Sequence, residues 1–379
     1  MNLQANFQAN FQAMPALDFI KISGTPFEAG QALGRFGSGA VHRHLLQADA
    51  WHQVMQWRGS PLAAAMAVHV QQRFPRIWQE LCGLADGLGV PFEQVLLWNC
   101  RGDLRLDPHT AGTHDGCTTV QLGRGETRRI SHNEDGDPGF AGHCAIAECR
   151  IEGSPGFASF VYPGSLPGHT FAVTEAGLAV TVNNLRPLHI DAGVPRMVLT
   201  RAVLDAPDLD AAVAMLCDTP RAGAFHLTLG HRASPELLSV EFNARHCSVR
   251  AITEPSLHAN HAIHPAMRDD PQVVTDSSRD RQRRGDQLLT QTRGAVDPLA
   301  VLADTNDGNT AALPIYRTDP HDPDGENTLA TADIAIKTSH IEWDIYEQPG
   351  TPPRYRLIDG HRQAQDAPPE EPPRRGAGV

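Results

Sequence analysis

The stretch His114-Asp115-Gly116-Cys117-Thr118-Thr119 places a cysteine directly after a glycine, where helix-like sequence gives way to strand-like sequence. A free cysteine has a pKa of about 8.5, so a neighbouring base must take its proton before it can act as a nucleophile. Cleavage of the Gly116–Cys117 bond would supply that base, because the new α-amino group of Cys117 has a pKa of about 7.7 to 8.0.

Glycine suits the position before the nucleophile. Without a Cβ, Gly116 tolerates the strained backbone needed to bring the Cys117 sulfur onto the Gly116 carbonyl carbon. The stretch therefore indicates self-cleavage between Gly116 and Cys117. Chemistry alone leaves a second interpretation open, in which Cys117 is one of seven ordinary cysteines buried as a small hydrophobic residue.

The sequence before this junction predicts helices. Apolar residues recur at helical spacing from Pro26 to about Asn99. Pro61, Pro75 and Pro91 are expected near helix starts, because proline is tolerated in the first turn but not inside a helix.

The sequence after the junction predicts short strands, with helices returning later. The expected strands are 118–122, 128–132, 145–151, 157–162, 170–174, 178–183, 225–229, 237–242 and 246–253, and the expected helices are 195–204, 209–217 and 278–292. Runs of strands alternating with runs of helices favour an α+β fold with layered sheets and helices over a doubly wound parallel sheet.

Composition narrows the class of protein. The 379 residues are 41% hydrophobic, and 32 basic against 44 acidic residues give a net charge of −12. This balance argues against a nucleic-acid partner, which would need a concentrated positive face. The chain has no apolar run of the roughly 18 to 20 residues that would span a bilayer and no basic-then-apolar leader, so we expect a cytoplasmic protein.

The cysteines, at positions 82, 100, 117, 144, 149, 217 and 247, are odd in number and scattered, with no Cys-x-x-Cys pair. This pattern predicts free thiols and no disulfide framework or zinc cage. Residues 24–34 lack the glycine spacing of a phosphate-binding loop, so no nucleotide cofactor is expected. Residues 1–19 are expected to be a flexible terminus, and 363–379 a disordered tail rich in Pro, Glu, Arg and Gly.

A set of motifs in a fixed order extends the interpretation. Asp115 to Thr119, together with Gly24-Thr25-Pro26-Phe27-Glu28-Ala29-Gly30 and Gly34 upstream, resembles the acyl-coenzyme A:6-aminopenicillanate acyltransferase (isopenicillin N acyltransferase) family. The likeness spans about residues 20–360, with further landmarks at 133–135, 177–183, 258–261, 276–283 and 315–317. That family is autoproteolytic and belongs to the N-terminal-nucleophile (Ntn) hydrolases.

The resemblance implies a fold and a domain organisation. It implies a four-layer αββα sandwich with the nucleophile at the start of an inner strand. Residues 20–116 would form a helical segment that becomes the α chain after processing, and residues 117–362 the Ntn-hydrolase β chain. The two processed chains would stay associated.

The resemblance also suggests roles for residues around Cys117. Asp135 matches the aspartate of the family's Asn-Trp-Asp pattern and would lie beside the nascent amine. Asn133 matches the first residue of that pattern, whereas Glu134 departs from it and alters the expected pocket shape. By composition alone, residues 133–138 could be only an acidic turn.

Two asparagines further along are candidates for contact with substrate. Asn260 is our candidate oxyanion donor, because acyl transfer develops negative charge that a side-chain amide can stabilise. Asn183 ends a strand-like run and is predicted, with Thr118 and Asn133, to contact substrate; alternatively, it only turns the chain. His258, His261 and His264 lack accompanying Cys or acidic ligands at a recognised spacing, so no metal site is predicted.

Three arginines complete the candidates. Arg317 follows an apolar run and matches a family arginine, where it could pair with Asp135 or with a substrate carboxylate. Arg281 and Arg283 fall on a strongly charged helix, and for these the interpretation favours a solvated face.

The function that these residues predict is a self-processing cysteine amidohydrolase or acyltransferase. After cleavage, Cys117 would take an acyl group from a small-molecule amide or acyl-coenzyme A as a thioester and pass it to water or an amine. The alternative is an unprocessed, non-catalytic binding or scaffold protein on the same fold, with Cys117 inert in the interior.

Overall fold

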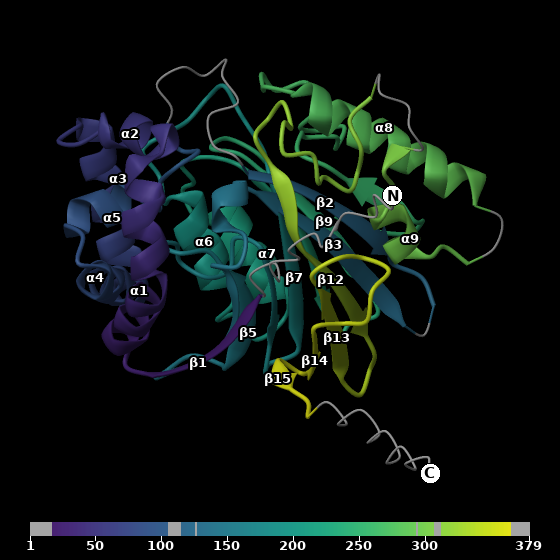
Figure 1. The fold of residues 1–379 in the computed structure, drawn as a ribbon, viewed down its shortest axis with the longest axis horizontal. Coiled ribbons are helices and arrows are strands. Elements are labelled where there is room, and N and C mark those ends of the chain that lie inside the picture. The colour runs from purple at the N-terminus through teal and green to yellow at the C-terminus, as the bar shows by residue number, and fades with distance from the viewer. Residues whose placement is uncertain (1–16, 105–114, 126, 293–294, 307–311, 365–379) are drawn as a thin grey trace, which may run out of the picture.

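The computed structural model describes residues 17–104, 115–125, 127–292, 295–306 and 312–364. They form a mixed α+β structure with two sheets and a group of N-terminal helices (Figure 1), which confirms the predicted fold class at this level. The predicted flexible terminus and disordered tail lie almost entirely in residues 1–16 and 365–379, outside the described residues.

The larger sheet has eight strands. In spatial order they are β1 (Asp18–Gly24), β4 (Ala145–Ile151), β5 (Phe157–Val161), β6 (Phe171–Thr174), β7 (Leu178–Asn184), β8 (Phe225–His231), β9 (Leu237–Phe242) and β10 (Cys247–Ala251). The sequence did not predict β1, which pairs with β4 in parallel and joins the N-terminal part of the chain to this sheet.

The second sheet has seven strands and carries Cys117. In spatial order they are β11 (Ser256–His258), β2 (Asp115–Leu122), β3 (Arg128–Gly136), β12 (Asn327–Ile336), β13 (Ile341–Tyr346), β14 (Tyr355–Ile358) and β15 (His361–Arg362). β2 contacts β7 of the larger sheet, so the two sheets pack against each other at the strand that holds Cys117.

Five helices gather on one side of the sheets (Figure 1): α1 (Pro26–Arg43), α2 (Asp49–Met55), α3 (Pro61–Arg73), α4 (Pro75–Leu88) and α5 (Phe92–Trp98), with a 3-10 turn η1 (Leu45–Gln47). As predicted, proline occupies the first position of α3 and α4 and directly precedes α5. Thr25 and Glu28 form a capping box at the start of α1.

Two glycines let α1 approach α4 closely. A Cβ on Gly30 would lie 1.9 Å from the Glu80 carbonyl oxygen, and one on Gly34 would lie 2.5 Å from that of Leu84. The glycines in the motif 24–34 therefore serve helix packing.

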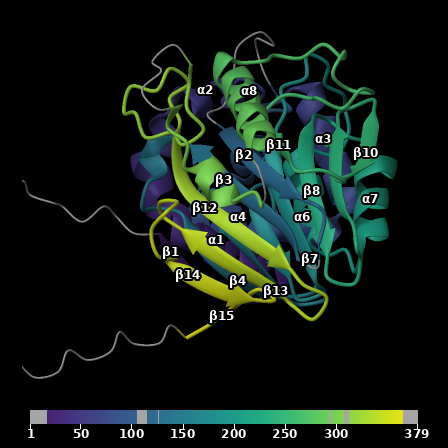
Figure 2. The same cartoon turned by 90° about the vertical axis from the view of Figure 1, so that its right-hand side faces the viewer.

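The remaining helices lie among and beyond the strands. They are α6 (Arg196–Val203), α7 (Leu209–Asp218), α8 (Asp276–Gln291), α9 (Pro298–Leu302) and the 3-10 turn η2 (Pro138–Phe140). α7 contacts β8, β9 and β10, whereas α9 contacts β2 and β3; Figure 2 shows α8 above the strands of the second sheet. Within the described ranges, no helix is long and apolar enough to cross a membrane.

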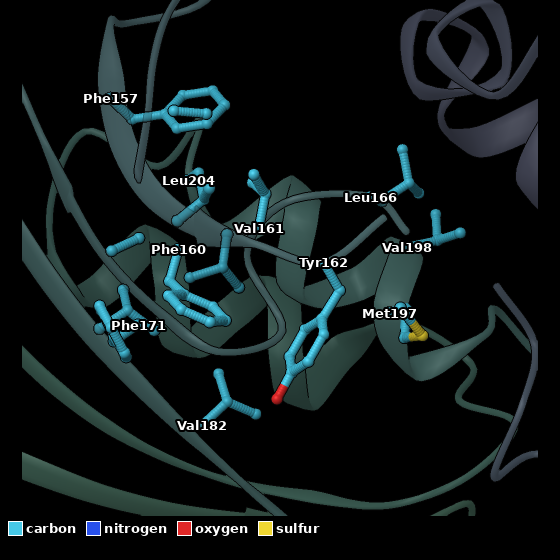
Figure 3. Close-up of a cluster of buried hydrophobic side chains, with 14 of the residues drawn as sticks. Phe157, Phe160, Val161, Tyr162, Leu166, Phe171, Val182, Met197, Val198 and Leu204 are labelled. Carbon is cyan, nitrogen blue, oxygen red and sulfur yellow. The ribbon is translucent and has the colours of Figure 1, made fainter. Parts of the chain in front are cut away.

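One large hydrophobic core joins the N-terminal helices to both sheets. It includes Leu33 of α1, Phe160 of β5 and Trp343 of β13. Figure 3 shows part of this core, in which Tyr162 packs among aromatic and aliphatic side chains. The segments on either side of the Gly116–Cys117 bond therefore share one interior.

The prediction that the cysteines are all free thiols is wrong at one pair. Cys217, in α7, and Cys247, at the start of β10, form a disulfide. They are 30 residues apart, and α7 packs onto β10, which brings the two sulfurs together. The other cysteines, including Cys117, remain thiols.

Candidate active site

The pairing of β2 with β3 decides which side chains surround the junction. Gly116 lies opposite Asp135, Cys117 opposite Glu134, and Thr118 opposite Asn133. Because side chains alternate between the faces of a sheet, Cys117 shares one face with Glu134, and Thr118 shares the other with Asp135. The site thus has two sides, separated by the backbone that is expected to be cut.

The backbone of Cys117 is held at both ends. Its N–H donates a hydrogen bond to Asn260 Oδ1 at 3.0 Å, and its carbonyl oxygen accepts one from Arg281 Nη1 at 2.6 Å. All three residues are buried. This arrangement restricts the backbone on the C-terminal side of the Gly116–Cys117 bond.

The side-chain amide of Asn260 is only partly hydrogen-bonded within the described residues. Its Oδ1 accepts from Cys117 N and from Arg281 Nη2 at 2.6 Å, while its buried Nδ2 has no hydrogen-bond partner among the described residues. A buried amide N–H without a partner is costly, and such exceptions often mark functional positions. The geometry is compatible with the predicted role of Asn260 as an oxyanion donor.

Arg281 corrects an interpretation from the sequence, because its side chain is buried and not part of a solvated face. It also donates to Thr118 Oγ1 at 2.8 Å and to Ser277 Oγ at 3.0 Å. The charged composition of α8 hid the pattern that would have revealed it: Ser277, Arg281 and Gly285 recur every four residues and form a buried stripe. Arg283, by contrast, is exposed as expected.

Charged side chains surround Gly116. A Cβ on this residue would lie 2.2 Å from Glu326 Oε2 and 3.1 Å from Arg317 Nη1, so any other residue would have to displace these side chains. Glu326 and Arg317 are both buried and form an ion pair. Burial raises the pKa of Glu326 to about 7, although the neighbouring arginines oppose that increase.

Arg317 is close to the site, but its ion pairs differ from the expected pairing with Asp135. Its guanidinium pairs instead with Asp322 and Glu326. The link to Asp135 is indirect: Thr328 accepts a hydrogen bond from Arg317 N at 3.1 Å and donates one to Asp135 Oδ1 at 2.6 Å. Sequence could not reveal this, because the acidic partners belong to the loop that follows Arg317.

Asp135 is buried, and its Oδ2 has no hydrogen-bond partner among the described residues. Burial raises the pKa of its carboxyl above the usual value, and the guanidinium groups of Arg281 and Arg317 oppose that increase. Its position opposite Gly116 places the residue beside the backbone that would become the new amine.

The thiol side of the site is also buried and polar. Cys117 Sγ lies 3.8 Å from Glu134 Oε2, which in turn lies 3.1 Å from His132 Nε2. Each residue has a polar atom within 4.8 Å of such atoms on the other two, so a thiol, a carboxyl group and an imidazole form one buried, directly contacting group. Sequence reasoning overlooked His132, although it lies two residues before Glu134 and therefore on the same face of β3.

The other predicted site residues have structural partners. Asn133 donates to Leu302 O at 2.9 Å and accepts from Thr331 Oγ1 at 2.7 Å, so it ties β3 to α9 and β12. Asn183 accepts a hydrogen bond from Thr119 Oγ1 at 2.8 Å across the sheet interface. Thr118 accepts from Arg281. The structure therefore connects Asn183 to β2 two residues beyond Cys117 and turns Asn133 toward α9.

Of the three histidines near Asn260, His258 and His264 place Nε2 within 4.0 Å of Glu241 Oε1, whereas His261 bonds a different partner. His258 Nε2 hydrogen-bonds Glu241 at 2.9 Å, His261 Nδ1 hydrogen-bonds Ser278 at 2.7 Å, and His264 Nε2 hydrogen-bonds Ser239 at 2.9 Å. They serve separate hydrogen bonds that hold β11 and the following loop in place.

A cavity of about 570 Å³ lies next to the charged side of the site. Its lining includes Arg317 and Thr328, and Thr328 is the hydrogen-bond partner of Asp135. Tyr316, Phe140 and Leu329 add apolar surface. The volume is in the range of small-molecule sites.

The chain is similar to known proteins over part of its length. The chain is 26% identical over 227 residues to the beta-alanyl-dopamine/carcinine hydrolase of Drosophila melanogaster, a match that covers 55% of this chain. The match spans 58% of the length of that relative. Residues 123–347 match the family described as acyl-coenzyme A:6-aminopenicillanic acid acyl-transferase, and this match begins just after Cys117. More than half of the chain is included, and the protein belongs to the acyl-coenzyme A:6-aminopenicillanic acid acyl-transferase family.

Proposed function

We propose that the protein is a cysteine amidohydrolase or acyltransferase that first cuts its own Gly116–Cys117 bond. The freed Cys117 then attacks the carbonyl of a small acyl amide or acyl thioester, and the resulting thioester passes its acyl group to water or an amine. The supporting observation is that the backbone N–H and C=O of Cys117 are hydrogen-bonded to Asn260 and Arg281, respectively. The residue before Cys117 is a glycine.

The surroundings of Cys117 suit both acyl transfers. Asn260 Nδ2 is available to donate to a carbonyl oxygen as it becomes negative, which is the role of an oxyanion hole. Asp135, opposite Gly116, would stabilise the ammonium group as the amide nitrogen leaves. Arg317 would orient the carboxylates around Gly116, or a substrate carboxylate in the adjacent cavity.

The packing supports a cleaved protein that holds together. Residues 20–116 would be the α chain and 117–362 the β chain, and β1 of the first pairs with β4 of the second along its whole length. Because both parts also share the hydrophobic core, we expect them to stay associated. The contacts of α7 with β8–β10, of β2 with β7, and of α9 with β2 and β3 support a four-layer αββα arrangement.

The named relative suggests the substrate class. Its activity on beta-alanyl-dopamine and carcinine favours amides of β-alanine or similar small amino acids over transfer from coenzyme A. We expect the purified protein to release free amine from β-alanyl amides, which chromatography would measure. The same assay on a panel of acyl thioesters and other N-acyl amides gives the comparison. Activity confined to acyl thioesters would exclude the amidase, and no turnover of any panel member would favour the scaffold alternative.

A variant of Asp135 tests the charged side of the site. Asp135→Asn keeps the shape and removes the charge that would stabilise the nascent amine. We therefore expect processing and turnover to slow by roughly 10²-fold, the lower end of the range for groups that assist proton transfer. Processing is followed by gel electrophoresis, and thermal unfolding checks the fold.

The matched control is Asp333→Asn on the adjacent strand β12. Asp333 is buried and bonded to Arg129 and Ser131, so this variant removes a comparable carboxylate outside the site. Equal rates for Asp135→Asn and wild type would remove Asp135 from the mechanism.

A further inference from the structure

A line of buried polar side chains leads from the Cys117 thiol into the space between the sheets. Glu134 Oε2 lies 3.8 Å from Cys117 Sγ and 3.1 Å from His132 Nε2. On the other side of the imidazole, His132 Nδ1 lies 2.8 Å from Thr119 Oγ1. All four residues are buried, so the other protein groups, and not water, decide which atom donates in each of these hydrogen bonds.

Asn183 sets the direction of these hydrogen bonds. Its Nδ2 donates to the carbonyl oxygen of His258 at 3.1 Å, which fixes the orientation of the amide. Asn183 Oδ1 therefore faces Thr119 Oγ1 at 2.8 Å and His226 Nδ1 at 3.0 Å. An amide oxygen only accepts, so the hydroxyl hydrogen of Thr119 must point to Asn183.

This direction fixes the tautomer of His132. Because the Thr119 hydroxyl hydrogen is used, Thr119 Oγ1 can only accept from His132. His132 Nδ1 consequently carries the hydrogen, and Nε2 carries a lone pair. Burial lowers the pKa of His132 to about 3, so the ring stays neutral near pH 7.

The contact between His132 Nε2 and Glu134 Oε2 therefore has no hydrogen to share when the carboxyl group is ionised. Two acceptors would face each other at 3.1 Å, and the contact becomes a hydrogen bond only when a proton sits on Glu134 Oε2. His132 Nε2 can thus accept a hydrogen bond from a protonated Glu134 but cannot donate one to the ionised form. The same oxygen also faces the Cys117 thiol, which has a proton to give.

We propose that Glu134 is the general base that takes the Cys117 thiol proton during self-processing. This assignment rests on the proposed self-cleavage and deepens it, because the α-amino group that would serve the mature enzyme does not exist before the bond is cut. Tyr162 is the positioning residue: its hydroxyl donates to Glu134 Oε1 at 3.0 Å and leaves Oε2 for the thiol and His132.

The step balances with water as the one added reactant. The S–H bond breaks and an O–H bond forms on Glu134, after which the thiolate adds to the Gly116 carbonyl carbon. When the C–N bond breaks, the proton on Glu134 passes to the Cys117 nitrogen, leaving a thioester and an amine. Water then hydrolyses the thioester, which restores the thiol and gives Gly116 a carboxyl terminus.

Two variants of the full chain separate basicity from shape. Glu134→Gln keeps the size but cannot take a proton as a carboxylate does, so we expect processing to slow by about 10²- to 10⁴-fold. Glu134→Asp shortens the side chain but keeps the carboxylate, so we expect faster processing than in Glu134→Gln. A packing role would give the reverse order, because Gln fills the space better than Asp.

The measurement is the rate at which intact chain is converted to two pieces, with thermal unfolding recorded for each intact variant. Glu148→Gln on β4 is the matched control, a buried glutamate whose ion-pair contacts to Lys21 and His361 are long, and it should process at the wild-type rate. If Glu134→Gln does not fold, Tyr162→Phe replaces it, and processing slower than wild type is expected because the carboxyl loses its orientation.

The outcomes are distinct for the two proposals. A wild-type chain that stays intact would overturn self-processing and, with it, the role of Glu134. A wild-type chain that is cut, with Glu134→Gln cut equally fast or faster than Glu134→Asp, would overturn only the assignment of the base. Slow Glu134→Gln with partial recovery in Glu134→Asp would support it.

Discussion

Cys117→Ala should leave the chain joined and inactive, whereas the wild-type chain should be cut into residues 1–116 and 117–379, which stay associated until they are denatured. Alanine removes the only atom that can attack the Gly116 carbonyl in the proposed mechanism. We expect the loss of rate to reach the scale of about 10⁶-fold that accompanies removal of a nucleophile from other acyl-transfer enzymes. The fold should persist, because a buried cysteine and an alanine differ little in volume.

Gel electrophoresis and sequencing of the new amino terminus measure this result directly. Cys82→Ala in α4 is the control, since Cys82 is a half-buried thiol away from β2, and it should process normally. An active wild-type protein in which Cys117 never acquires an α-amine would contradict self-cleavage and leave the scaffold alternative standing.

Arg281→Met should abolish processing and destabilise the protein, while Arg283→Met on the same helix should do neither. Arg281 donates to Cys117 O, Thr118 Oγ1 and Asn260 Oδ1 in a buried environment. Methionine fills similar space but leaves these three acceptors and Ser277 Oγ without this donor. It also leaves the buried Asp135 without one of its compensating charges. Breaking buried networks of this kind typically costs about 3 to 5 kcal/mol.

Chemical denaturation measures the free energy of unfolding for both variants, and gel electrophoresis measures processing. Arg283 is exposed and pairs with Asp280 three residues earlier, so its loss should change stability by less than about 0.5 kcal/mol. Equal stability and processing for the two variants would show that the buried contacts of Arg281 contribute neither to the free energy of unfolding nor to processing.

The contrast between Arg281 and Arg283 also illustrates what the sequence can and cannot predict. Both residues lie in a charged stretch, and composition favours a solvated face for each. The structure separates them because α8 presents one stripe to β11 and the Asn260 loop, and Arg281 lies on that stripe. Charge alone does not show which face of the helix a residue lies on, whereas the four-residue spacing of Ser277, Arg281 and Gly285 does.

Glu134 shows a similar limit. Its departure from the family pattern was visible, but its contact with the Cys117 thiol depends on the register of β2 against β3. A shift of one residue would have placed Asn133 there instead. The Cys217–Cys247 disulfide is a third case, since the packing of α7 onto β10 brings together two cysteines that spacing alone does not connect.

Local patterns in the chain were sufficient to place the candidate nucleophile after Gly116, to separate a helical part from a strand-rich part, and to identify most strands before residue 253. These features depend on residues that are close in the chain, so their chemistry and hydrophobic periodicity can be read directly from the sequence. Only the folded structure decided that Arg281, Asn260 and Glu134 meet Cys117, because contacts between residues 17 to 164 positions apart are set by strand register and helix packing.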